Sequence, residues 1–272
     1  MTTLPGNENE LCTFLNWDSD FFGLRIGRVN SQRLEPVQMH TALNWCRENA
    51  INCLYFMADA GDPATIRLAE EHGFRLCEVR LTYERDLKEW QPQPVPRQYG
   101  DVLIRQATAQ DVPALQEIAK KAYTTTHYVT DPFFPQEKVE EFYATWINNS
   151  VLEGFDDMVL VAEAQFEDST PDEVIAFITA RLLAEPDGSQ AAPGQRKSHI
   201  PLIGVKAGLR KKGVGMELIR AMFDWLVQNG ACHTIGVCQA ANPPVRRIIE
   251  RLGFLSISAH LYYHKWLQPS DS

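Results

Sequence analysis

Apolar residues recur at helical spacing in the stretch that follows Gly215. Those that share one helical face are Leu218, Ile219, Met222, Phe223 and Leu226. This spacing predicts an amphipathic helix. The next run, 234–238, predicts a strand, and a second helix is expected over 244–252. Asn242 followed by Pro243 is a favourable helix start, and Gly253 can end the helix.

The same succession of elements occurs twice in the chain, at an offset of 180 residues. The positions that match are Trp45 with Trp225, Asn49 with Asn229, Asp62 with Asn242, Gly73-Phe74 with Gly253-Phe254, Leu81 with Leu261, Tyr83 with Tyr263 and Leu87 with Leu267. Each copy reads as helix, buried strand, polar turn, helix, Gly-Phe and a strand pair. The fold class expected is therefore α/β (α+β), built from tandem mixed sheets flanked by helices.

Proline alternates with other residues over 91–100, which disfavours both helix and sheet interiors. We therefore expect a partial domain over 1–90, a linker over 91–100 and a second domain over 101–272. Residues 185–199 are rich in Gly, Pro and Ser and are expected to form an inserted hairpin.

The composition narrows the range of functions. A formal charge of −9 with no basic block disfavours nucleic acid as a partner. No run of about 18 apolar residues and no signal-like start is present, so we expect a cytoplasmic protein without membrane insertion. The six cysteines form no C-x-x-C pair, so we expect reduced thiols and no metal. The sequence leaves a homodimer open.

One loop combines features of an anion-binding site. The strand 201–205 leads into Arg210-Lys211-Lys212-Gly213-Val214-Gly215 and then into the predicted helix. A helix start offers unpaired N–H groups and a favourable dipole, and glycines allow a phosphate to approach the backbone closely. A tight turn beside a solvated basic face is the plainer interpretation. The loop matches neither the Walker A pattern nor the dinucleotide-binding glycine pattern.

Arg210-x-x-Gly213-x-Gly215, followed by Asn242-x-x-Val245-x-x-Ile248-x-x-x-x-Gly253-Phe254, resembles the acyl-CoA signature of the GNAT N-acyltransferases. The resemblance covers about 101–267. It implies acetyl-CoA as acyl donor. The residues implied in cofactor binding are Val205, Lys206 and Ala207 for the pantetheine, Arg210, Lys211, Lys212, Gly213, Val214 and Gly215 for the pyrophosphate, and Asn242 near the cofactor arm. A helix cap is the alternative for Asn242. The first copy has Asn30, Arg33 and Glu35 at the loop positions, so we expect it to pack or to wall one side of the substrate cleft.

The segments 16–23, 126–131 and 142–147 resemble the TDP-fucosamine acetyltransferases within that family. Those enzymes acetylate the 4-amino group of a nucleotide-linked 4-amino-4,6-dideoxyhexose. The resemblance implies a small-molecule acceptor and suggests His127, Tyr128 and Asp131 as substrate-binding residues, with His127 as a possible base. Solvated polar residues on an exposed loop are the alternative for His127 and Asp131. Tyr143, Trp146 and Ile147 lie at helical spacing and are expected in the core.

Acetyl transfer needs an oxyanion donor, which the family takes from a main-chain N–H near Val205, and a proton for the departing thiolate. The related sugar acetyltransferases carry a Tyr as proton donor where this chain has Ile249. Tyr262 is the replacement candidate, because Tyr263 is matched by Tyr83 in the copy without a CoA loop. Cys238 as a nucleophile is a further alternative, although no base is adjacent in the sequence. The function expected is N-acetylation of a nucleotide-linked amino sugar. The alternatives are another small amine as acceptor, or a non-catalytic CoA-binding regulator.

Overall fold

The computed structural model describes residues 10–93, 97–99, 102–164, 173–184, 195–209 and 213–267. The described residues of the first half, 10–93, form four strands and three helices. In chain order they are β1 (Cys12–Phe14), α1 (Asn16–Phe22), β2 (Ile26–Val29), α2 (Pro36–Glu48), β3 (Cys53–Asp59), α3 (Pro63–Glu71) and β4 (Arg75–Asp86).

The second half, from residue 97, carries the other elements of the described chain. In order they are β5 (Arg97–Tyr99), β6 (Val102–Gln106), a 3₁₀ turn (Ala109–Asp111), α4 (Val112–Ala122), α5 (His127–Thr130), α6 (Gln136–Leu152), β7 (Met158–Ala164), β8 (Glu173–Leu182), β9 (Arg196–Ile200), β10 (Ile203–Val205), α7 (Val214–Gln228), β11 (Ala231–Gln239), α8 (Pro243–Arg251) and β12 (Leu255–Trp266). The periodic segments predicted above correspond to α7, β11 and α8, and Gly253 follows α8 with a φ of 76°.

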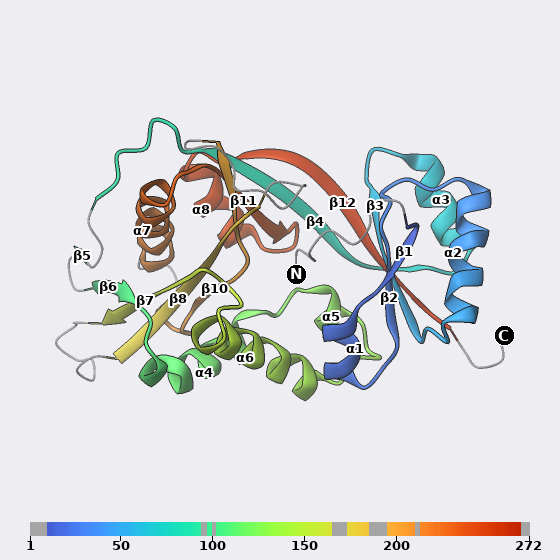
Figure 1. Ribbon diagram of the computed structural model, residues 1–272, viewed down its shortest axis with the longest axis horizontal. Helices are drawn as coiled ribbons and strands as arrows, with labels where there is room; N and C mark the ends of the chain where they lie inside the picture. Colours follow the sequence, from blue (N-terminus) through green and yellow to red (C-terminus); the bar gives the residue numbers. More distant parts are fainter. Residues whose placement is uncertain are drawn as a thin grey trace.

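The strands of both halves join in one mixed sheet, and the last strand of each half is exchanged. The strand order is β1-β2-β3-β12-β4-β11-β9-β8-β7-β6-β5, with β10 paired to β8. β12 thus lies between β3 and β4 of the first half, while β4 lies against β11 of the second. Figure 1 shows the long strands β4 and β12 side by side across the middle of the molecule.

The predicted tandem arrangement is confirmed by matching elements at the predicted offset. β4 and β12 span equivalent positions, and so do α3 and α8, each pair displaced by 180 residues. Part of the expected linker belongs to the sheet. Arg97–Tyr99 lies inside 91–100 and forms β5 at the edge of the sheet. Residues 94–96 and 100 lie outside the described residues.

Buried apolar side chains form three clusters on the two faces of this sheet. One lies between α7, α8 and the strands of the second half, and one lies under α2 and α3 in the first half. The third joins α4 and α6 to α1 and to strand residues of both halves. Figure 1 shows α7 and α8 on one side of the second half and α4 and α6 on the other. The third cluster therefore seals the junction of the halves on the α4–α6 side.

The sequence predicts reduced cysteines and no membrane insertion. All six cysteines are unpaired, and all but Cys77 are buried. No helix among the described residues combines the length and apolarity needed to cross a bilayer.

Candidate active site

β11 separates from the consecutive strands β9 and β10 ahead of the loop motif, after Ile200. β9 pairs with β11 in parallel as far as Ile200 opposite Gly236. Pro201 and Leu202 then interrupt the strand, and β10 continues against β8 alone. From Val237 onward β11 pairs with β4 only. The expected strand 201–205 is therefore shorter than predicted, because proline cannot donate to the sheet.

The register of β10 turns main-chain groups of Val205 toward this divergence. The Lys206 N–H donates to Ile175 O at 2.8 Å, so Lys206 is a hydrogen-bonded position of the β8 ladder. Antiparallel ladders alternate, so the N–H and C=O of Val205 point away from β8. This is the orientation that an oxyanion or amide donor on this strand requires. Ala207 is exposed, and the Lys206 ammonium pairs with Glu173.

The start of α7 lies just beyond this strand. Gly213 is its N-cap, with a φ of 84° and no side-chain cap, and its carbonyl accepts from the Met216 N–H at 2.9 Å. Among the described residues, the neighbours of Gly213 in space leave room, because nothing lies within 4 Å of a Cβ built on Gly213. The first N–H groups of a helix have no partner inside it, which suits an anion here. Arg210, Lys211 and Lys212 lie outside the described residues.

The other two cofactor candidates on α7 point into the protein. Val214 is buried in the α7–α8 core. A Cβ on Gly215 would lie 3.7 Å from Val205 Cγ2 and 3.9 Å from Ile248 Cδ1. Gly215 therefore lets the helix start approach both β10 and α8, and the main chain, rather than a side chain, faces the loop.

Asn242 caps α8, as the simpler interpretation of this residue expected. Its Oδ1 accepts from the Val245 N–H at 3.5 Å, and its counterpart Asp62 caps α3 by accepting from the Ala64 N–H at 3.2 Å. Ile249, at the position where the resemblance leads one to expect a proton donor, is buried in the apolar cluster under α8. A direct contact of Asn242 with the cofactor stays a prediction.

Tyr262 lies in a buried polar cluster at the junction of the halves, with 8% of its surface exposed. Its ring stacks on the His127 ring at a centroid distance of 4.2 Å, and the Arg80 guanidinium carbon lies 4.4 Å from its centre. No described residue hydrogen-bonds its hydroxyl. Burial raises the pKa of Tyr262 well above its usual value, so the hydroxyl keeps its proton. A protonated, unengaged phenol is what a proton donor requires.

Glu78 and Arg80 come to this cluster from the first half and were not found by sequence analysis. Arg80 Nε donates to Glu78 Oε1 at 2.7 Å, and the other carboxylate oxygen accepts from the His127 main-chain N–H at 2.8 Å. The Glu78 side chain is fully buried. The sequence does carry a signal for these two residues. Glu-x-Arg alternates within a strand whose other positions are apolar or exposed, and such a charged pair is unusual in a domain copy whose only role is packing.

The three expected substrate residues share one short segment but differ in what they can offer a ligand. His127 begins α5, and all three are buried, so the exposed-loop alternative is wrong. The Tyr128 hydroxyl donates to Asp18 Oδ1. Asp131 Oδ2 accepts from the Trp266 indole at 2.8 Å and contacts His264 Nδ1 at 2.6 Å. Of the three side chains, only His127 keeps a polar atom without a partner among the described residues.

Cys238 and Cys77 do not have the character of reactive or ligating thiols. Burial raises the pKa of Cys238 to about 11 and of Cys77 to about 12, so both are protonated near neutral pH. The Cys77 thiol lies within 4.8 Å of donor atoms of Asp131 and His264, but those atoms hydrogen-bond to each other. A hydrogen bond accounts for this group better than a metal ion does.

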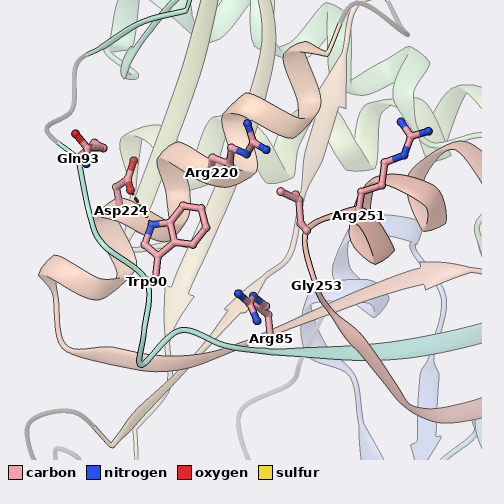
Figure 2. Close-up of a pocket in the computed structure, with 8 residues that line it drawn as sticks. Arg85, Trp90, Gln93, Arg220, Asp224, Arg251 and Gly253 are labelled. Atoms are coloured by element: carbon pink, nitrogen blue, oxygen red, sulfur yellow. Dashed lines mark hydrogen bonds between the residues drawn. The ribbon is translucent and has the colours of Figure 1, made fainter.

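A separate cavity of about 480 Å³ lies between α7 and the end of α8 (Figure 2). Arg85, Arg220 and Arg251 line it with Trp90 and Asp224. Arg220 pairs with Glu217 at 2.9 Å, and the Arg85 guanidinium would meet a Cβ on Gly253 at 3.3 Å, at the helix end. Arg251 in the last turn of α8 and Arg85 beside Gly253 lie at the C-terminus of α8, where cations are favourable, whereas Arg220 lies within α7.

Comparisons with known proteins agree with this geometry. The model of the Acetyltransferase (GNAT) family matches residues 113–254, and the chain belongs to this family. It is therefore an acetyltransferase of a family whose acyl donor is acetyl-CoA. The chain is 25% identical over 217 residues to a protein named dTDP-fucosamine acetyltransferase from Escherichia coli O6:H1 (strain CFT073), covering 79% of this chain and 80% of that protein.

A second relative is the spore coat polysaccharide biosynthesis protein SpsD of Bacillus subtilis (strain 168). It is 25% identical over 157 residues, which cover 57% of this chain and 48% of that protein. Among solved structures, a GCN5-related N-acetyltransferase from Sphaerobacter thermophilus matches with a TM-score of 0.61 and 16% identity, over 95% of this chain and 76% of that one. A tandem GNAT protein from the clavulanic acid biosynthesis pathway matches with a TM-score of 0.57 and 12% identity, over 90% of this chain and 76% of that one. These structures share the fold.

Proposed function

We propose that the protein transfers an acetyl group from acetyl-CoA directly to the amino group of a nucleotide-linked amino sugar, of the TDP-4-amino-4,6-dideoxyhexose type. The 25% identity to the Escherichia coli protein, spread over most of both chains, carries the proposal. The spore coat polysaccharide relative fits the same chemistry. The buried polar cluster supports it, since an acceptor sugar offers many hydroxyl groups that need partners.

The donor side of the reaction rests on main-chain groups. The pyrophosphate would lie at the start of α7 on the amides from Gly213 onward, with Arg210, Lys211 and Lys212 adding charge. The pantetheine would follow β10 along Val205, Lys206 and Ala207. The Val205 N–H, which points away from β8, would donate to the tetrahedral oxyanion.

The acceptor side rests on side chains from both halves. The amine attacks the thioester carbon, and the departing thiolate takes the Tyr262 proton. The neutral Tyr262 hydroxyl and its stacking on His127 support this role. Tyr128 and Asp131 would shape the acceptor side of the site through the residues to which they hydrogen-bond, Asp18 and His264.

Thiol release from acetyl-CoA tests the proposal. The purified protein is assayed with a TDP-4-amino-4,6-dideoxyhexose and, beside it, with amino acids, aminoglycosides and free amino sugars. Release with the nucleotide sugar alone is the expected result. Release with another amine only would contradict the acceptor while keeping the acetyltransferase, and binding of acetyl-CoA without release on any amine would contradict the proposal.

A further inference from the structure

Three buried side chains form one continuous hydrogen-bonded chain beneath Tyr262. Asp131 Oδ2 lies 2.6 Å from His264 Nδ1, and His264 Nε2 lies 2.9 Å from His127 Nδ1. The two imidazoles come from β12 and α5, more than 130 positions apart in the sequence, so the fold assembles this chain. His264 is fully buried, and the other two residues are 4–6% exposed.

The protonation of this chain follows from its chemistry. Burial opposes the charge on Asp131, but hydrogen bonds from His264 and Trp266 outweigh it and hold its pKa below the usual value, so it is a carboxylate. Burial lowers the pKa of both imidazoles, so both are neutral. A carboxylate only accepts, hence His264 carries its proton on Nδ1 and accepts on Nε2. His127 must then carry its proton on Nδ1.

This order of protons leaves one basic nitrogen at the His127 end of the hydrogen-bonded chain. With its proton on Nδ1, His127 has the lone pair on Nε2, and no described residue donates to that atom. The ring is held by stacking on Tyr262 and by the edge of Tyr55 at 5.3 Å. The Nε2 lone pair therefore has a fixed direction beside the proposed proton donor.

We propose that His127 Nε2 is the base that takes the proton from the attacking amine, and that His264 and Asp131 are positioning residues that fix its tautomer and stabilise the cation formed. This deepens the proposed function and rests on it for the identity of the amine. The proposal assigns His264, which sequence analysis did not find, and gives Asp131 a role through His264 rather than on the substrate.

The proton count closes over one turnover. The amine nitrogen forms a bond to the acetyl carbon and loses one proton to His127 Nε2, while the carbon–sulfur bond breaks and the thiolate takes the Tyr262 proton. His127 then returns its proton to the Tyr262 oxygen through solvent. No proton is gained or lost overall, since the amine loses one and the thiol gains one.

Several titratable groups lie near His127, and each of them can affect the pH dependence of the reaction. Close to it are Glu78 and Arg80 from β4, Tyr55 from β3, Tyr262 and His264 from β12, and its neighbour Tyr128. Behind these lie Asp131 against His264, Asp18 against Tyr128, and Tyr143 from α6 near Glu78 and Arg80. Arg80 disfavours the imidazolium, whereas Asp131 favours it through His264. Removal of the Asp131 charge should lower the His127 pKa further.

The first experiment needs no acceptor. Nitrogen-15 NMR of the free full-length protein distinguishes protonated from unprotonated ring nitrogens, and His127→Asn assigns the signal among the seven histidines. We expect His127 with its proton on Nδ1. His264→Phe, which keeps the ring that stacks on Tyr55, should release His127 to the other tautomer or a mixture. A proton on Nε2 in the unaltered protein would overturn the proposal, whatever the acceptor.

The second experiment is kinetic and uses a matched control. Asp131→Asn removes a buried carboxylate that accepts an indole N–H at 2.8 Å, and Asp224→Asn does the same on α7, where Asp224 accepts from Trp90 at 2.8 Å. With the amine that proves active, we expect Asp131→Asn to lower kcat at least about tenfold and His127→Asn about 10²- to 10⁴-fold, with little change in KM for acetyl-CoA. In His127→Asn, kcat should keep rising with pH, because solvent must deprotonate the amine. Equal kinetics for Asp131→Asn and Asp224→Asn, or an unchanged pH profile in His127→Asn, would refute the base.

Discussion

Arg80 and His260 face each other across the β4–β12 ladder, and they are equivalent residues of the two copies, 180 positions apart. The irregularities on either side of this pair, at Cys77 and Ile257, are equivalent positions as well. An approximate twofold axis therefore passes between Arg80 and His260, as in a self-complementary interface between identical subunits. Because of it, Glu78 and Arg80 of the first half lie in the buried polar cluster around Tyr262 of the second half.

Gly213→Glu tests the anion site at the start of α7. A carboxylate there repels the pyrophosphate, and the φ of 84° adds backbone strain. Charged hydrogen bonds contribute about 1.5–3 kcal/mol, so calorimetry should show acetyl-CoA affinity falling about 10- to 100-fold. Gly213→Asn is the control, because asparagine tolerates this conformation without the charge. If both variants bind equally well, the loop does not hold the pyrophosphate.

Tyr262→Phe tests the proton donor, with its neighbour on the same strand as control. Loss of the hydroxyl should lower kcat by about 10²-fold with little change in KM for acetyl-CoA. Tyr263 points to the opposite core, where its hydroxyl donates to Glu70 Oε1 at 3.3 Å. Tyr263→Phe should therefore cost about 1 kcal/mol of stability at most and leave kcat unchanged. An unaltered kcat in Tyr262→Phe would remove this residue as donor.

Cleavage between the halves tests the exchange of strands. If a protease site is inserted after Gln93 and cut, β4 should remain bound between β11 and β12 through its main-chain hydrogen bonds. The two fragments should elute together in size-exclusion chromatography and separate only in urea. Fragments that separate under native conditions would show that the shared sheet contributes little to their association.

The predicted elements that the structure confirms are those set by local patterns. Periodicity and capping residues located α7 and α8, since Asn242 and Gly253 act within a few residues of each helix. The position of β12 in the sheet could not be predicted from the sequence, because the pairing of Tyr262 with Met57 and Glu78 joins residues far apart in sequence. The strand expected over 201–205 was wrong at its start, because Pro201 interrupts the sheet and β10 begins at Ile203.

The candidate site likewise has a part that the sequence predicts and a part that it does not. The start of α7 at Gly213 follows from the motif, whereas the buried polar cluster around Tyr262 is made of tertiary contacts. Sequence analysis found Tyr262 but missed His264, although two residues along a strand point to the same face. It treated Asp131 as a possible substrate ligand, because nothing local shows that His264 and Trp266 already engage its carboxylate.

Asp111→Asn tests an ion pair in the second half. Arg105 donates two hydrogen bonds of 2.8 Å to Asp111, and they hold the pKa of that carboxyl below its usual value. A lowered pKa means that the stabilisation is complete above the unfolded pKa near 4 and disappears as the pH falls through the folded value. Urea unfolding at pH 7 should show a loss of about 1–2 kcal/mol that shrinks toward pH 3.

Glu117→Gln is the control for this pair. Glu117 is 63% exposed and pairs with Lys120 at 3.6 Å, and such surface pairs contribute little. A loss in Asp111→Asn that stays constant down to pH 3 would show that charge plays no part in the stabilisation.

The exchanged strands also bear on how such a protein can change over evolutionary time. A duplicated domain that has lost its ligand motif is ordinarily dispensable, and deletion of its gene segment would cost only its own stability. Here deletion of the first copy would remove β3 and β4 and leave both edges of β12 and one edge of β11 without partners. It would also remove Glu78 and Arg80 from their contacts with His127 and Tyr262. The shared sheet therefore makes the first copy indispensable to the second, and its sequence can change freely only at positions that face away from β12 and from the cluster around Tyr262.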